Sequence, residues 1–224
     1  HVFAANSTYT NPLSAVEFFR KTGVDALAIS YGTMHGASKG KNVKLRREIP
    51  IAIRECMNHE GLHGALVSHG SSTVPQYIVD EINALGGAIQ NAYGISKEEL
   101  KAVIPCGISK INVDTDIRLA VTRNLRELFR DRPELKTDAR IGGVWELLDK
   151  NRAAFDPRAF LPPLMDTVMY GTGDDGTVAL ITDAMRRGVR EAVGTLIVEF
   201  GSVGRAPLVE LAGLDEMAAR YAKE

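Results

Sequence analysis

Short apolar runs alternate with longer amphipathic stretches along the first half of the chain. Val24 to Ser30 and Gly64 to Ser68 run apolar into polar loops, and Ile108 to Val113 gives a third such segment. This pattern is typical of parallel strands that are covered on both faces. Their spacing of about 40 residues, with helical stretches between them, indicates right-handed βα units on one parallel sheet. Such units build a (β/α)8 barrel or a doubly wound fold.

Capping signals place helices between these strands. A polar residue or a proline stands where each helix is expected to begin, and glycines stand where most of them end. The predicted helices run over about residues 12–22, 50–60, 75–85 and 96–103, and a long helix follows residue 114. In the helix expected from Pro50, the residues predicted to face the core are Ile51, Ile53, Cys56 and Met57.

From Asp131 the pattern changes to helical stretches joined by connections rich in proline and glycine. Val178 to Phe200 is the longest of these stretches. Its apolar residues recur near one helical face, which predicts that this face packs against the rest of the chain. They are Val178, Ile181, Met185, Val189, Val193, Leu196 and Phe200. We therefore expect a helical appendage at the C-terminal end.

Composition narrows the class of protein. The 224 residues are 45% hydrophobic and 25% charged, as expected of a folded globular chain. A net charge of -1 gives no basic field to hold nucleic acid or an anionic membrane surface. No apolar run approaches the roughly 18 to 20 residues of a membrane span. The two cysteines, Cys56 and Cys106, form no CxxC pair, so we expect a cytoplasmic location and no disulfide framework.

Candidate metal ligands follow the predicted strands. His35 and His69 come just after the first two strands, and Asn112 with Asp114 lies at the end of the third. Because ligands bind at the carboxyl ends of parallel strands, these side chains are expected to meet. Two imidazoles there could share one zinc ion, or could simply be hydrogen-bonded loop histidines. A catalytic zinc normally has three protein ligands, so the third would come from elsewhere in the chain or from a segment absent from it.

The residues after each histidine suit an anion such as phosphate. Gly36 and Gly70 let the backbone approach closely, and Ser72 follows in the second loop. Lys39 adds a point charge, although its lysine-rich surroundings would also suit a solvated face.

Two further positions could hold phosphate or could serve structure alone. Asp114 and Thr115 precede a helix whose positive end would favour an anion, but both are also ordinary capping residues. Arg158 follows a rigid Asp156-Pro157 turn that could aim its guanidinium at a phosphate, or could be a turn and nothing more.

Five segments in order together resemble the zinc-dependent class II fructose-1,6-bisphosphate aldolases. They are Tyr9 to Pro12, Thr22 to Ala28, Tyr31 to Lys39, Ser68 to Ser72 and Asn112 to Asp116. The resemblance covers most of the chain and extends into 155–158 and the 201–221 tail. It is greatest to the Calvin-cycle-type subgroup, whose Gly-Gly-x-Ile segment is like residues 86–89. The family has a TIM-barrel fold.

The resemblance implies a role for each candidate residue. It makes His35 and His69 zinc ligands, places Asn112 against the dihydroxyacetone moiety, and brings Arg158 to the distal phosphate, in the family from the partner subunit. A monovalent cation, Na+ or K+, often lies near the phosphate in that family. The implied phosphate-binding residues are Gly36, Gly70, Ser72, Asp114 and Thr115, with Lys39 beside them.

The implied reaction is reversible aldol cleavage of fructose 1,6-bisphosphate to dihydroxyacetone phosphate and glyceraldehyde 3-phosphate, a step of glycolysis, gluconeogenesis and the Calvin cycle. The implied architecture is the C-terminal part of a TIM (β/α)8 barrel. Residues 1–130 would supply about three βα units with the metal and phosphate motifs. Residues 131–224 would form a helical extension that packs on the barrel and joins contacts in a homo-oligomer.

One departure from the family is large. Its upstream half, with the proton-transferring Asp and a further zinc ligand, has no counterpart in this sequence. We therefore assign the reaction to a parent protein and expect little or no turnover from this fragment. The alternatives are a tagatose-1,6-bisphosphate aldolase and a non-catalytic phosphosugar-binding or assembly fragment. A metal-free TIM-barrel isomerase is disfavoured because it gives the two histidines no joint task.

Overall fold

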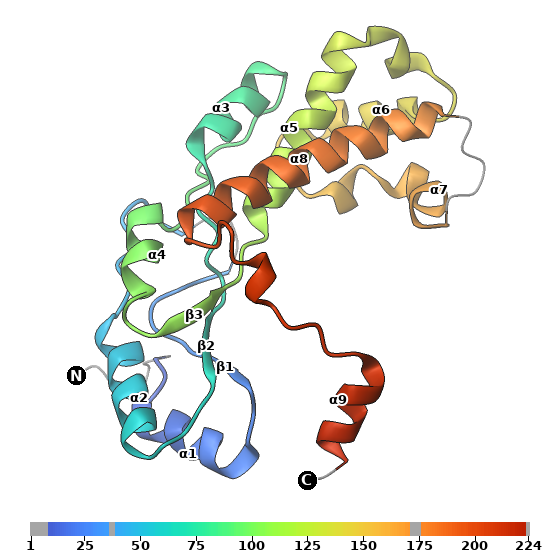
Figure 1. The fold of residues 1–224 in the computed structure, drawn as a ribbon. Helices are drawn as coiled ribbons and strands as arrows, with labels where there is room; N and C mark the ends of the chain where they lie inside the picture. The colour runs from blue at the N-terminus through green and yellow to red at the C-terminus, as the bar shows by residue number, and fades with distance from the viewer. Residues whose placement is uncertain (1–8, 36–38, 171–175, 223–224) are drawn as a thin grey trace.

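A three-stranded parallel sheet forms the centre of the N-terminal part (Figure 1). The computed structural model describes residues 9–35, 39–170 and 176–222. Its strands are β1 (Ala26–Ala28), β2 (Ala65–Ser68) and β3 (Ile108–Ile111), in the order β1-β2-β3. Both strand pairs are parallel, and Leu66 of β2 lies opposite Leu27 of β1 and Ile108 of β3. The predicted βα units are confirmed as an arc like part of a (β/α)8 barrel, with strands shorter than expected.

Helices occupy the intervals that the sequence predicts, and further helices follow β3. Their caps use local chemistry. The Asn11 side chain accepts hydrogen bonds from the backbone N–H groups of Leu13 and Ser14, and the Ser96 hydroxyl accepts one from the N–H of Glu99. The helices are α1 (Pro12–Thr22), α2 (Glu48–His59), α3 (Gln76–Ala84), α4 (Lys97–Val103), α5 (Thr115–Asp131), α6 (Gly142–Lys150), α7 (Met165–Tyr170), α8 (Thr177–Glu199) and α9 (Leu214–Tyr221).

The sheet is not covered evenly. In β2 the residues from Leu66 to Ser68 are buried, whereas Ala26 and Ala28 of β1 are exposed and Leu27 is half-buried. The expectation that every strand is covered on both faces is therefore wrong for β1, and also for β3, in which Ser109 and Lys110 are exposed. Within the described ranges, none of these exposed strand residues belongs to a cluster of buried apolar side chains.

The core face of α2 also differs from the prediction. Its buried apolar stripe includes Ile49, Ile53 and Met57, which are spaced four residues apart and so share one helical face. Ile51 is 40% exposed because it lies two positions, about 200°, from that stripe. The predicted burial of Ile53 and Met57 is confirmed, and that of Ile51 is wrong.

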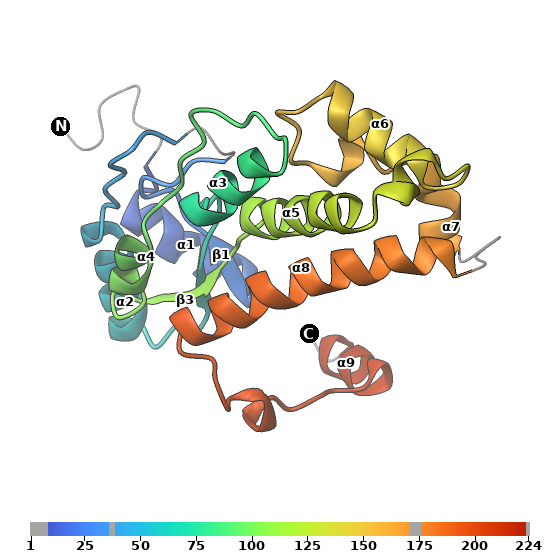
Figure 2. The same ribbon diagram turned by 90° about the horizontal axis from the view of Figure 1, so that it is seen from above.

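The long helix α8 lies alongside α5 (Figure 2). Its contact face contains small residues, so the two backbones approach closely: a Cβ added to Gly188 would lie 2.7 Å from the carbonyl carbon of Ala120. The predicted inward positions Val189 and Val193 are instead 40% and 38% exposed. The buried residues of α8 are Val178, Ile181, Ala184, Gly188 and Ala192.

The C-terminal segments differ in how they pack. Buried residues of α6 and α8 share one apolar cluster with α5. By contrast, α9 has no buried residue, and Figure 1 shows it set apart at the end of an extended segment. Its Tyr221 hydroxyl donates a hydrogen bond to Asp25, just before β1, at 3.2 Å. Over the described ranges, no helix has both the length and the apolar character needed to cross a membrane.

Candidate active site at the carboxyl ends of the strands

One cavity of about 490 Å³ opens just past β2 and β3, and it gathers most of the predicted site residues. Each comes from a loop after a strand or from the start of α5, where a parallel sheet places its ligands. The predicted residues that line it are His35, Lys39, His69, Gly70, Ser72, Asn112, Asp114 and Thr115. Gly36 lies outside the described residues, and Arg158 is not among the lining residues.

The rings of the two histidines lie next to each other in the lining of this cavity. Their ring centroids are 5.9 Å apart, with the ring planes inclined by 39°. Two imidazoles bound to one tetrahedral zinc would have centroids about 5.2 Å apart, given Zn–N distances of about 2.0 to 2.1 Å, so the observed separation lies within about 1 Å of that value. The backbones that carry them are also close, since a Cβ on Gly70 would lie 2.8 Å from the carbonyl carbon of Met34. The pair therefore fits two of the three protein ligands that a catalytic zinc normally has.

No third ligand stands beside this pair in the part of the chain that the structure describes. Among those residues, no group of three or more His, Cys, Asp or Glu side chains could hold a metal ion. The neighbouring polar group is the amide of Asn112, whose Nδ2 lies 3.0 Å from Nδ1 and 3.2 Å from Nε2 of His69. The Asn112 side-chain oxygen accepts a hydrogen bond from Lys110, so the amide is held at both ends.

Hydrogen bonds among buried hydroxyl groups stabilise the loop that carries His69. The Tyr31 hydroxyl is hydrogen-bonded to Ser68, and Ser68 in turn to Ser71 at 2.7 Å; all three residues are fully buried. Burial raises the pKa of Tyr31 to about 12, so this phenol stays neutral at physiological pH. The loop after β2 is therefore held by a neutral hydrogen-bonded network.

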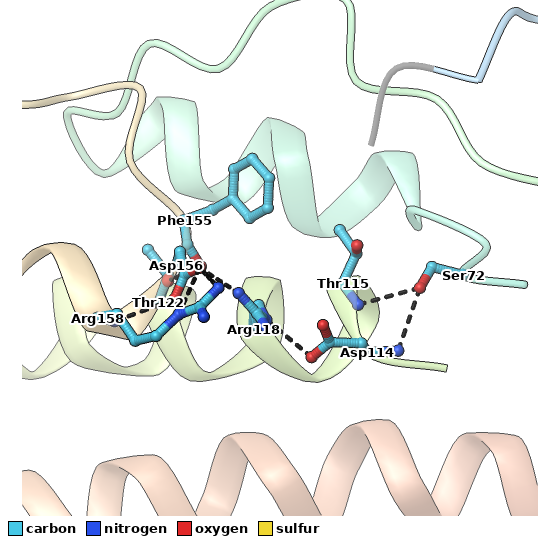
Figure 3. A network of polar contacts seen from close by, with 8 residues as sticks. All are labelled: Ser72, Asp114, Thr115, Arg118, Thr122, Phe155, Asp156 and Arg158. Atoms are coloured by element: carbon cyan, nitrogen blue, oxygen red, sulfur yellow. Dashed lines mark hydrogen bonds and ion pairs between the residues drawn. The ribbon is translucent and has the colours of Figure 1, made fainter. Parts of the chain in front are cut away.

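Ser72 caps α5 from a distant part of the sequence (Figure 3). Its hydroxyl oxygen accepts hydrogen bonds from the backbone N–H groups of Asp114, at 3.1 Å, and Thr115, at 3.0 Å. Asp114 occupies the N-cap position, but its side chain makes no capping hydrogen bond and pairs with Arg118 instead. The reading of Asp114 as an ordinary side-chain cap is therefore wrong, because Ser72 performs that task.

Lys39 is the cation of the cavity. Only 1% of this residue is exposed, and its ammonium donates a hydrogen bond to the backbone carbonyl of Ser72 at 3.2 Å. Burial lowers its pKa, while the negative charge of Asp116 acts in the opposite direction. The solvated-face reading of Lys39 is therefore wrong: the structure places a desolvated positive charge beside the start of α5.

Sequence reasoning missed Asp116. This buried carboxylate accepts hydrogen bonds from the Thr73 N–H and hydroxyl and from the Val74 N–H, at 3.1, 2.6 and 2.9 Å. It therefore fixes the loop that leaves β2, in which Val74 has a positive φ of 52°. An acidic residue in the first turn of a helix is already favoured by the helix dipole. The sequence position of Asp116 therefore gives no sign of its hydrogen bonds to Thr73 and Val74.

Arg158 lies away from the cavity lining. Its guanidinium folds back onto Asp156, with an Nη2 to Oδ2 distance of 2.6 Å, and its side chain is 79% exposed. The turn itself is well defined, since the Asp156 carboxylate also accepts a hydrogen bond from the Arg158 N–H at 3.0 Å. In this chain alone, Arg158 is presented to solvent.

These features define a βα-type chain with a polar cavity at the carboxyl ends of its strands. The sequence profile of the family described as "Fructose-bisphosphate aldolase class-II" matches residues 1–173. Fructose-bisphosphate aldolase 2 of Cereibacter sphaeroides is 33% identical over 95% of this chain and 49% of its own length. Fructose-bisphosphate aldolase class 2 of a Synechocystis strain is 35% identical over 96% of this chain and 48% of its own. The Thermus caldophilus fructose-bisphosphate aldolase is 36% identical over 88% and 50%.

The chain belongs to the class-II fructose-bisphosphate aldolase family. It spans about half the length of the curated relatives that it matches. The reaction and substrate of the whole protein are therefore matters of proposal.

Proposed function

We propose that the protein to which this chain belongs catalyses zinc-dependent, reversible aldol cleavage of fructose 1,6-bisphosphate to dihydroxyacetone phosphate and glyceraldehyde 3-phosphate. The observation that supports this most directly is the pair of imidazoles 5.9 Å apart in a cavity that also holds the buried Lys39 ammonium. A divalent cation and a phosphate can bind side by side there.

His35 and His69 would hold the zinc, which when bound supplies a Lewis acid for the charge that develops on carbon–carbon cleavage. We assign Asn112 to an oxygen of the dihydroxyacetone moiety, and its contact with His69 in the same cavity supports this role. The remaining lining residues surround the space beside this amide and suit a substrate phosphate.

The proposed phosphate site combines several donors. Lys39 supplies a full charge, and the start of α5 supplies a partial positive charge from its dipole. Gly70, with a φ of 64°, keeps its loop close enough for backbone N–H groups to approach the anion. We assign Gly36, Ser72, Asp114 and Thr115 to the same site, with a Na+ or K+ ion nearby, and Arg158 to the distal phosphate of a substrate bound by a partner subunit.

We further propose a cytoplasmic homo-oligomer, with residues 1–130 as the site-bearing barrel part and 131–224 as the helical extension. The outer face of α8 supports self-association, since Val189, Val193 and Ile197 are 38 to 40% exposed along it. In the tail, Leu211 and Leu214 are 91% and 89% exposed. Apolar side chains this open to water favour burial against another surface.

Zinc binding by the 224-residue chain tests the metal site. We expect one weakly bound zinc ion per chain, because only two protein ligands are at hand, and a loss of affinity of about tenfold or more in His35→Ala and in His69→Ala. His59→Ala is the matched control, since this exposed histidine lies on α2. Calorimetric titration with zinc measures all three variants; equal affinity in wild type and both site variants would reject the assignment.

Turnover tests the reaction. The parent protein with zinc should cleave fructose 1,6-bisphosphate in preference to tagatose 1,6-bisphosphate, and the 224-residue chain alone should show little or no cleavage. An assay of aldol products with both sugars distinguishes the two substrates. Full activity of the short chain would contradict the expected dependence on the rest of the protein.

A further inference from the structure

The carboxylate of Asp156 has two arginine partners that come from different parts of the fold (Figure 3). Arg158, two residues away, contacts it through Nε and Nη2. Arg118, on α5, contacts the same Oδ2 atom through Nη1. Their exposures differ widely: the side chain of Arg118 is 25% exposed and that of Arg158 is 79% exposed. One partner is therefore fixed on a helix and the other is open to solvent.

Arg118 also reaches the cavity rim. Its Nε donates to Oδ1 of Asp114 at 2.7 Å, one helical turn earlier, while Nη1 is engaged with Asp156. Because separate nitrogens make these two contacts, one guanidinium holds both carboxylates at once. One turn further along α5, the Thr122 hydroxyl donates to the carbonyl of Phe155 at 3.0 Å, which fastens the same turn to the helix.

We propose that Arg118 is a positioning residue: it restrains the Asp114 carboxylate at the rim of the phosphate site and keeps Asp156 paired when Arg158 turns away to bind the distal phosphate of a substrate. This inference rests on the proposed function. It assigns Arg118 no contact with substrate. Its effect passes through Asp114 and Asp156.

The charges explain why such a residue is needed. Asp114 lines a cavity suited to phosphate, and an unrestrained carboxylate there would repel the anion. Arg158 and Arg118 together hold the pKa of Asp156 below its usual range, so this group remains charged. The exposed ion pair between Arg158 and Asp156 costs little free energy to break, provided that the Asp156 carboxylate keeps a second cationic partner. Arg118 is that cation.

A titration without ligand tests the structural half of the proposal. Carboxyl-carbon NMR of the full chain follows Asp156, assigned by loss of its signal in Asp156→Asn. In Arg158→Gln, which mimics release, the pKa of Asp156 should remain below its ordinary value because Arg118 still contacts it. In the double variant with Arg118→Gln it should return to that value. If Arg158→Gln alone restores the ordinary pKa, the proposal is overturned.

Binding of fructose 1,6-bisphosphate tests the functional half. Arg118→Gln should weaken binding about tenfold. Adding Asp156→Asn should recover only part of the loss, because it removes the Asp156 charge while the Asp114 carboxylate remains without Arg118. Arg118→Lys should recover little, since one ammonium cannot span both carboxylates. Arg123→Gln is the control: Arg123 also lies on α5, but its ion pairs with Glu81 and Glu191 lie away from the cavity lining.

The outcomes separate this inference from the proposed function. Equal affinity in Arg118→Gln and Arg123→Gln overturns the role of Arg118 while leaving the phosphosugar site intact. If the wild-type chain binds neither fructose 1,6-bisphosphate nor inorganic phosphate, the phosphate site on which the proposed function depends is rejected. The NMR titration still decides whether Arg118 holds Asp156.

Discussion

At the residue scale, the backbone of Gly70 packs directly against the loop that carries His35. It has a left-handed φ of 64°, and its Cα faces the Met34 carbonyl so closely that an added Cβ would lie 2.8 Å from the carbonyl carbon and 3.0 Å from the nitrogen of His35. These are backbone atoms, so they cannot move aside to make room for a Cβ as the end of a flexible side chain could. The separation of His35 and His69 therefore depends on the absence of a side chain between them.

Gly70→Ala should push these two loops apart. We expect an unfolding free energy lower by about 1 to 3 kcal/mol, from left-handed strain plus the clash, and a zinc affinity reduced along with it. Urea denaturation and zinc titration measure the two effects. Gly204→Ala is the control, because Gly204 has a similar φ of 71° but nothing within 4 Å of an added Cβ. If both variants lose stability equally and zinc affinity stays unchanged, the contact with the Met34 loop has no role.

At the scale of elements, the most extensive contact within the described ranges is that between α5 and α8. Gly188 is buried against the backbone of Ala120, whereas Gly194, less than two turns later on α8, has open space around an added Cβ. The same substitution should therefore act in opposite directions at the two sites. A steric cost dominates at Gly188, and helix propensity dominates at Gly194.

We expect Gly188→Ala to destabilise the chain by about 1 to 3 kcal/mol and Gly194→Ala to stabilise it by up to about 1 kcal/mol. Thermal and urea unfolding of the two variants give the comparison directly. Stabilisation by Gly188→Ala would mean that α8 is not seated on α5 as described.

These helices also show what the sequence could and could not predict. Caps and strand runs are local signals, and they placed β1 to β3 and the helices between them correctly. The inward face of α8 was predicted from large apolar residues, yet small residues such as Gly188 make the contact. Small side chains are needed there because the backbones of the two helices lie close together. For the site, strand-end position was enough to gather His35, His69 and Asn112. The links made by Asp116 and Arg118 depend on distant partners and leave no local pattern.

At the scale of the whole molecule, apolar side chains remain open to water on α8 and in the tail. If this face joins copies of the chain, charge placed on it should separate them. We expect Val193→Asp combined with Ile197→Asp to shift the wild-type oligomer toward monomer, and Ser202→Asp, at an exposed polar site, to leave it unchanged. Sedimentation velocity measures the distribution. A wild-type chain that is monomeric at all concentrations would reject the proposed homo-oligomer.

The order of the strands has a consequence for how the chain is made. In the described part of the sheet, each strand pairs with a strand adjacent to it along the chain, and β2 lies between the other two. As the polypeptide leaves the ribosome, β2 and then β3 each find a partner strand already synthesised. Assembly can therefore proceed one βα unit at a time during translation, and the newest strand always forms the open edge of the growing sheet.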